Sequence, residues 1–192
     1  LLAWQPAHAQ LRVDISGTGA TQYPIGIADF SGDETRGRAM AEVIRADLSR
    51  TGQFRLINTA GAGLTIDSAI VYDDWRGRGA DFLAYGTIAQ GPDGRFRISY
   101  RLADTVKKNQ LDTAEFSATE QELRSIAHQI ADRIYEKITG VRGVFNTRIA
   151  YVLKKGNTYE LQVADADGQN PQVALRSREP IISPTWSPDG SK

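Results

Sequence analysis

The chain has 192 residues, 23 basic and 23 acidic side chains with no net charge, and no cysteine. A balanced charge gives no electrostatic footprint for nucleic acid, and no apolar run approaches the roughly 18 residues of a membrane span, so we expect neither nucleic-acid binding nor direct membrane insertion. The lack of cysteine excludes disulfides, thiol catalysis and cysteine-ligated metals.

The first nine residues are typical of the end of a secretory signal peptide. A short apolar segment is followed by Ala7-His8-Ala9, which places small residues where a signal peptidase requires them. We therefore interpret residues 1–9 as a signal remnant, with cleavage between Ala9 and Gln10, and expect an exported protein. A chance apolar terminus is the alternative.

Residues 11–15 alternate apolar and polar side chains and are predicted to form a strand. The glycine-rich polar stretch 16–22 has little to bury, so we expect it to be mobile. A strand on such a tether can dock at an edge of its own protein or be captured by a partner through strand addition. From the residues alone, an ordinary edge strand with a loose loop is the favoured interpretation.

A strand–helix–strand unit is predicted next, from strands at 23–30 and 54–57 and a helix at about 36–51. We interpret the carboxylates of Asp33 and Glu34 as groups that complement the dipole of the following helix. A calcium loop is the disfavoured interpretation, because the segment lacks the spaced oxygen ligands of an EF-hand. The apolar face of the helix carries Met40, Val43, Ile44 and Leu48.

Antiparallel strands follow this unit. Residues 82–88 are nearly all apolar, as in a central strand, and Gly91-Pro92-Asp93-Gly94 predicts a hairpin turn. The next strand alternates apolar residues with arginines, and residues 111–116 add a last strand. The predicted fold class is therefore α+β, with a mixed sheet packed by two helices.

Paired carboxylates at Asp73 and Asp74 raise the possibility of acid–base catalysis. Adjacent residues on a helix point about 100° apart, so we do not expect these two to share a site. We expect Arg76 or Arg78 to pair with them, and Trp75 to pack over the sheet.

The second helix is predicted between a capping box, with Thr119 as N-cap and Glu122 at the third position, and the stop at Gly140. His128 is predicted on its polar side, with Gln121, Ser125 and Asp132. A histidine in that place supports neither a catalytic triad nor a metal site. We therefore predict no catalytic, cofactor-binding or metal-binding residue, and no enzyme. The helix carries its apolar stripe on Leu123, Ile126, Ala127, Ile130, Ile134 and Ile138.

The last quarter of the chain predicts an all-β unit. Short strands at 148–153, 158–164 and 172–176 are separated by turns, which is the spacing of a propeller blade. The closing motif 183–192 contains Trp-Ser-Pro-Asp-Gly, a tight turn that needs a further strand. We therefore expect the chain to be a fragment cut inside a β-propeller.

The C-terminal part of the chain resembles the TolB family, the periplasmic β-propeller proteins of the Tol–Pal system. The resemblance lies in the strand at 148–152, the turn at 165–168 and the closing motif, and in their place behind the segment 137–151. The resemblance covers the chain after Ala9. It implies the following organisation: an N-terminal α/β domain at 10–140, a linker at 141–147 and a first propeller blade at 148–192.

The resemblance also implies a function. Family members are non-enzymatic proteins that link TolA with the Pal lipoprotein and maintain outer-membrane integrity during cell division. Pal is expected to bind mainly through later blades. The alternative is a propeller-bearing fragment of a secreted serine hydrolase, which a downstream G-x-S-x-G motif would indicate. TolA is expected to bind the extreme N-terminus, here matched by Leu11, Arg12, Val13, Asp14, Ile15 and Ser16.

Overall fold

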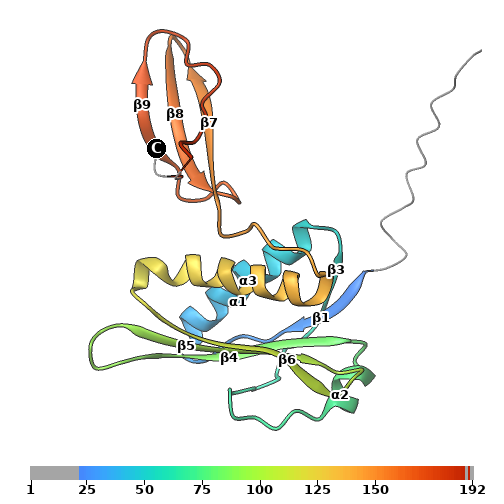
Figure 1. Cartoon of the computed structure of the whole chain (residues 1–192). Coiled ribbons are helices and arrows are strands. Elements are labelled where there is room, and N and C mark those ends of the chain that lie inside the picture. Colours follow the sequence, from blue (N-terminus) through green and yellow to red (C-terminus); the bar gives the residue numbers. More distant parts are fainter. Residues whose placement is uncertain (1–21, 189, 191–192) are drawn as a thin grey trace, which may run out of the picture.

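The computed structural model describes residues 22–188 and 190, which form two sheets joined through a helix (Figure 1). The larger sheet comes first in the chain, and a smaller antiparallel sheet stands at the C-terminal end. The signal remnant, its cleavage site at Ala9 and Gln10, and the predicted strand at 11–15 lie outside the described residues.

The larger sheet is mixed. β1 lies inside it, parallel to both of its neighbours, β3 and β4, whereas β5 runs antiparallel to both of its neighbours, β4 and β6. The prediction of a mixed sheet is therefore confirmed. The order across the sheet is β3 (Phe54–Ile57), β1 (Tyr23–Ile27), β4 (Phe82–Gln90), β5 (Phe96–Asp104) and β6 (Asn109–Ala118), with the two-residue β2 (Ser31–Gly32) also paired to β4.

The two long helices, α1 (Glu34–Arg50) and α3 (Leu123–Thr139), lie on the same face of this sheet (Figure 1). α1 begins where the Asp33 carboxylate accepts a hydrogen bond from the backbone N–H of Arg36 at 3.0 Å. The predicted capping box is present on a short 3-10 turn, η1 (Glu120–Glu122), that leads into α3.

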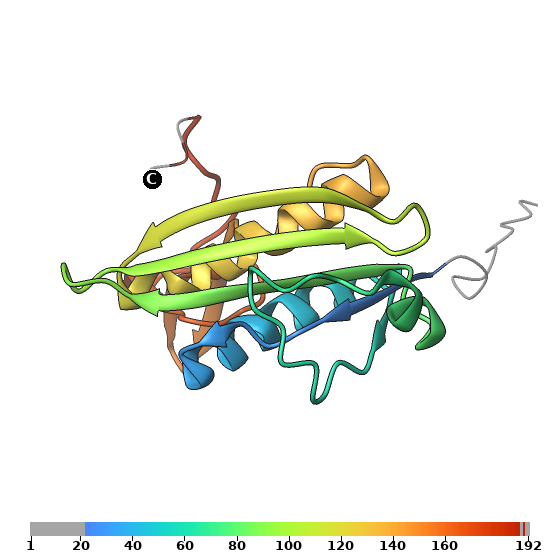
Figure 2. The same cartoon turned by 90° about the horizontal axis from the view of Figure 1, so that it is seen from below.

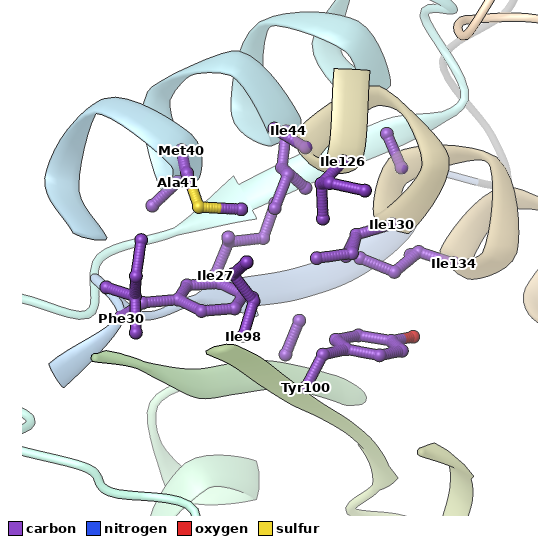
Figure 3. Close-up of a cluster of buried hydrophobic side chains, with 14 of the residues drawn as sticks. Ile27, Phe30, Met40, Ala41, Ile44, Ile98, Tyr100, Ile126, Ile130 and Ile134 are labelled. Carbon is purple, nitrogen blue, oxygen red and sulfur yellow. The ribbon is translucent and has the colours of Figure 1, made fainter. Parts of the chain in front are cut away.

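The main core fills the space between these helices and the sheet. In Figure 3, isoleucines from α3 and the side chains of α1 point toward Ile27, Ile98 and Tyr100 of the sheet. All three sheet residues are at most 1% exposed, as period-two alternation in β1 and β5 requires. The predicted apolar stripes of both helices face this core.

The other face of the sheet is covered only in part. α2 (Tyr72–Gly77) and the loop between β3 and α2 lie over it, as the view from below shows (Figure 2). Trp75 packs there with Leu83 and Tyr85 of β4, and it is 6% exposed, which confirms the prediction for this residue. β4 therefore buries both of its faces, which explains its nearly continuous apolar sequence.

The smaller sheet consists of β7 (Arg148–Lys155), β8 (Thr158–Asp165) and β9 (Gln172–Ser177), all antiparallel. The closing turn is formed by the hydrogen bond from the N–H of Gly190 to the carbonyl of Ser187, at 2.8 Å. Among the helices of the described residues, none has the length and apolarity needed to cross a membrane.

Candidate functional site

The segment between α3 and β7 is attached to the helix that precedes it. The backbone N–H groups of Phe145 and Asn146 donate to the carboxylate of Asp132 at 2.7 and 3.1 Å. The ring of Phe145 packs edge-on against Tyr135, with the ring centroids 5.7 Å apart. The stretch predicted as a linker therefore holds the small sheet close to α3.

The end of β8 and the loop after it meet the helices through two carboxylates. Asp167 bonds Nη2 of Arg124 and lies 3.9 Å from Nη2 of Arg50, while Asp165 lies 3.5 Å from Nε of Arg124. Burial alone would raise the pKa of Asp167. The backbone N–H of Gln169 and the charge of Arg124 instead hold that pKa below its ordinary value. Asp167 is therefore an anion held between cations of α1 and α3.

The structure corrects the predicted position of His128. We predicted it on a polar helix side with Gln121, Ser125 and Asp132, and that prediction is wrong. His128 is 2% exposed, and its Nδ1 lies 2.6 Å from Oδ2 of Asp47, which is 1% exposed. The cause is that α3 packs against α1 as well as against the sheet, so its buried arc is wider than its apolar stripe.

The second ring nitrogen of His128 faces the small sheet. Nε2 lies 4.0 Å from Oδ2 of Asp167, and it is buried with no hydrogen-bond partner among the described residues. The other oxygen of Asp47 bonds Arg50. These charged groups meet where α1, α3 and the loop after β8 converge, and we refer to them as the junction cluster: Asp47, Arg50, Arg124, His128, Asp165 and Asp167.

Part of the junction cluster resembles a metal site. His128, Asp165 and Asp167 offer ligand atoms within 4.8 Å of one another, a donor set that suits a divalent transition metal. Arg124 already contacts both carboxylates, and Arg50 approaches the same oxygen of Asp167. A metal ion would have to displace these guanidinium groups. The charges fit an ion-pair network and do not fit a cation site.

An open groove of about 540 Å³ lies beside the junction cluster, between α1, α3 and the loop after β8. Met40, Val43 and Leu123 give it apolar walls, and the charged pair Arg36–Glu120, with Nε 2.8 Å from Oε2, forms part of its lining. The described lining contains no hydroxyl, thiol, amine or imidazole group.

The carboxylate pair on α2 has a different partner from the one predicted. Nζ of Lys108 lies 2.8 Å from Oδ1 of Asp73, and this contact lowers the pKa of Asp73. Arg78 stacks instead on the ring of Trp75, with its Cζ 4.7 Å from the ring centroid. The charge of Arg76 also lowers the pKa of Asp73, so this predicted partner contributes, but the ion pair at contact distance is made by Lys108, which the turn after β5 brings from far along the chain.

The residues predicted to bind a partner, 11–16, lie outside the described residues, so only their point of attachment is defined. The side-chain amide of Gln22 donates to the carbonyl of Gly52 at 3.0 Å, and the N–H of Tyr23 donates to the carbonyl of Gln53 at 2.8 Å. The chain therefore enters the sheet beside the start of β3, which is an edge strand.

An α+β domain followed by an antiparallel blade places the chain among proteins that join an α/β domain to a β-propeller. Residues 11–111 match the family model of the TolB amino-terminal domain, and residues 135–192 match that of the TolB beta propeller domain. The chain belongs to the TolB family.

Its relatives agree with this assignment. The chain is 86% identical over its whole length to the Tol-Pal system protein TolB of Bordetella avium, and 80% identical to that of Bordetella pertussis. A crystal structure of TolB from Acinetobacter baumannii superposes with a TM-score of 0.78 at 34% identity, covering 88% of this chain and 42% of that one. The chain spans 44% of the length of the two curated relatives.

Proposed function

We propose that the chain is part of a non-catalytic periplasmic protein that links TolA to the Pal lipoprotein and so maintains outer-membrane integrity during cell division. Its relatives are named as proteins of the Tol-Pal system, which supports this setting. The observation that carries the proposal is the attachment of the N-terminal segment. Residues before Tyr23 lead directly into a strand held between two parallel neighbours, so capture of that segment acts on an internal strand of the sheet.

TolA is the partner proposed for residues 11–16. Their alternating side chains suit strand addition, in which main-chain hydrogen bonds give affinity and alternate side chains give specificity. When no partner is bound, the same strand can dock on its own protein, and β3 offers the nearest free edge. Pal is proposed to bind the propeller blades of the longer protein and to favour one of these two states.

A non-catalytic role is supported by the surroundings of the imidazole. His128 is the one histidine among the described residues, and its two ring nitrogens face the carboxylates of Asp47 and Asp167. The hydroxyl of Ser125, one turn away, bonds the side chain of Asn146 instead. Among the described residues, the imidazole therefore faces carboxylates and not a hydroxyl. The alternative function would place its catalytic serine downstream of the propeller, and a G-x-S-x-G motif in that sequence tests it.

Calorimetric titration with the C-terminal domain of TolA tests the proposal. We would compare residues 10–192 with a version that begins at Tyr23. Val13→Pro removes a backbone donor from the predicted strand, and Thr18→Pro is the matched control in the glycine-rich stretch. Strand addition predicts binding by the longer form and by Thr18→Pro, and loss of binding in the truncated form and in Val13→Pro.

Two results would count against the proposal. Equal binding by the truncated form would move the contact into the folded domain. Absence of binding by every form, with far-UV circular dichroism showing folded protein, would remove TolA as the partner of this chain.

A further inference from the structure

We propose that the outer edge of β6 is a strand-addition site, and that it takes an extended acidic segment of a partner protein. β6 is the last strand in the order of the larger sheet, so only one of its sides is paired, to β5. Figure 2 shows it at the rim of the sheet. β3 forms the opposite rim, so this site is distinct from the edge proposed above for residues 11–16, and the inference does not rest on that proposal.

The outward main-chain groups at this edge belong to every second residue of β6. The carbonyl of Ser99 points toward β4, so the main-chain groups of Tyr100, the next residue of β5, point toward β6. Tyr100 pairs with Ala114, whose groups therefore face β5. Its neighbours Thr113 and Glu115 face outward, as antiparallel alternation requires, and no side chain of the described residues bonds the outward groups of Glu115. This edge therefore offers an incoming strand its main-chain hydrogen bonds.

A groove of about 480 Å³ lies beside this edge, on the side of the helices. Phe116 of β6 and Val144, which is 64% exposed, give the groove apolar surface, and Gln129 and Arg133 of α3 also line it. Side chains alternate across a strand, so every second side chain of an added strand would point into this groove. The partner strand should therefore carry apolar residues at these positions.

The opposite face of the sheet favours acidic residues at the remaining positions. Arg97 and Arg101 of β5 lie there, and neither guanidinium group makes an ion pair or hydrogen bond with the described residues. They stand opposite Ser117 and Thr113 of β6, whose side chains are short enough for the guanidinium groups to pass over them toward the next strand position. Glu115 provides one carboxylate against these two cations, so the face is complementary to an acidic strand.

Arg95 makes an acidic partner necessary as well as favourable. Its Nη2 donates to the carbonyl of Ser117 at 2.9 Å, and its Nε donates to the hydroxyl of the same residue at 3.0 Å. The outward carbonyl of Ser117 is thereby covered, and Arg133 covers that of Thr113 more loosely, at 3.4 Å. A carboxylate of the incoming strand can take the guanidinium of Arg95, and a backbone N–H of that strand then donates to the freed carbonyl. Strands without acidic side chains leave the carbonyl covered, so Arg95 selects the partner.

Nuclear magnetic resonance titration of the isotope-labelled chain tests the proposal. The probe is a short blocked peptide in which valine and glutamate alternate, and the matched control is the same peptide with lysine in place of glutamate. We expect the glutamate peptide to shift the amide signals of residues 113–117 and not those of residues 54–57 on the opposite rim. The lysine peptide should bind weaker by roughly tenfold or more, because it is repelled by Arg97 and Arg101 and leaves Arg95 in place.

Two substitutions at one position separate main-chain pairing from charge. Glu115→Pro removes the outward N–H at the centre of the edge and leaves the hydrogen bonds to β5 in place, as proline on an edge strand allows. It should weaken binding of the glutamate peptide roughly tenfold, which is the effect of one hydrogen bond. Glu115→Ala is the matched control. It keeps the N–H and removes a charge of the same sign as the peptide, so it should bind at least as tightly as the parent chain.

Far-UV circular dichroism establishes that each variant is folded. If Glu115→Pro is not, Arg97→Gln combined with Arg101→Gln tests the charge requirement, and should weaken binding of the glutamate peptide roughly tenfold. Equal binding of the two peptides, shifts confined to the arginine side chains with residues 113–117 unmoved, or undiminished binding by folded Glu115→Pro would overturn the proposal. Absence of binding at millimolar peptide would do the same.

Discussion

Gly86 occupies a position in β4 where no side chain fits. It pairs with Tyr100 of β5, and the ring of Phe30 lies against it. A methyl group on Gly86 would fall well inside contact distance of the carbonyl oxygen of Ser99 and of the Phe30 ring edge. The carbonyl belongs to the neighbouring strand, and Phe30 is 1% exposed, so neither group has room to yield.

We therefore expect Gly86→Ala to lower the free energy of unfolding by about 1–3 kcal/mol, the range for overpacking a filled core. For a chain of this size, the melting temperature falls by roughly 2–4 °C for each kcal/mol. Gly77→Ala at the end of α2 is the matched control, because an added Cβ there meets nothing within 4 Å. Urea unfolding followed by far-UV circular dichroism measures both, and equal midpoints for the two variants would refute the packing argument.

Two further predictions concern ion pairs. Arg133 bonds Asp112 through Nε and Nη2 at 2.8 and 2.7 Å. Arg133→Met leaves the buried carboxylate with Lys137 alone, whose Nζ lies 4.0 Å from Oδ1, and should lower the free energy of unfolding by about 1–3 kcal/mol in thermal melts. Arg133→Lys should lower it by less. In the blade, the pKa of Glu160 is lowered from 4.5 to about 2 by its donors, Lys155, Arg176 and Gln162. The stabilisation that the ionised Glu160 gives to the folded blade is therefore complete above pH 4.5 and lost as the pH falls toward 2. An acid titration followed by near-UV circular dichroism should show this loss. Glu160→Gln should remove that part of the pH dependence.

Much of the fold was predictable because local signals agreed with the final packing. The capping box at Thr119 and the alternation of β5 depend on neighbours in sequence, and both appear where they were predicted. The helix stripes predicted one buried face, and the sheet supplies the surface that covers it. The domain boundaries at 140 and 148 stay predictions.

The junction cluster was not predictable by the same means. Periodicity predicts burial against one surface, but α3 packs on two, so His128 is buried at a position that reads as polar. Its partner Asp47 lies 81 residues earlier in the chain, and no local pattern connects them. The sequence does place His128 and Asp47 each at the margin of the apolar stripe of its helix. That position indicates a buried pair only when the two helices are considered together.

The position of β1 has a mechanical consequence. The chain enters the sheet at Tyr23, and β1 is bonded along both sides, to β3 and to β4. A pull on the preceding segment acts along the strand axis, so it loads the hydrogen bonds of both ladders at the same time instead of opening them one after another. A partner that holds residues 11–16 under tension would therefore be resisted by both hydrogen-bond ladders together, which suits a strand through which force is transmitted.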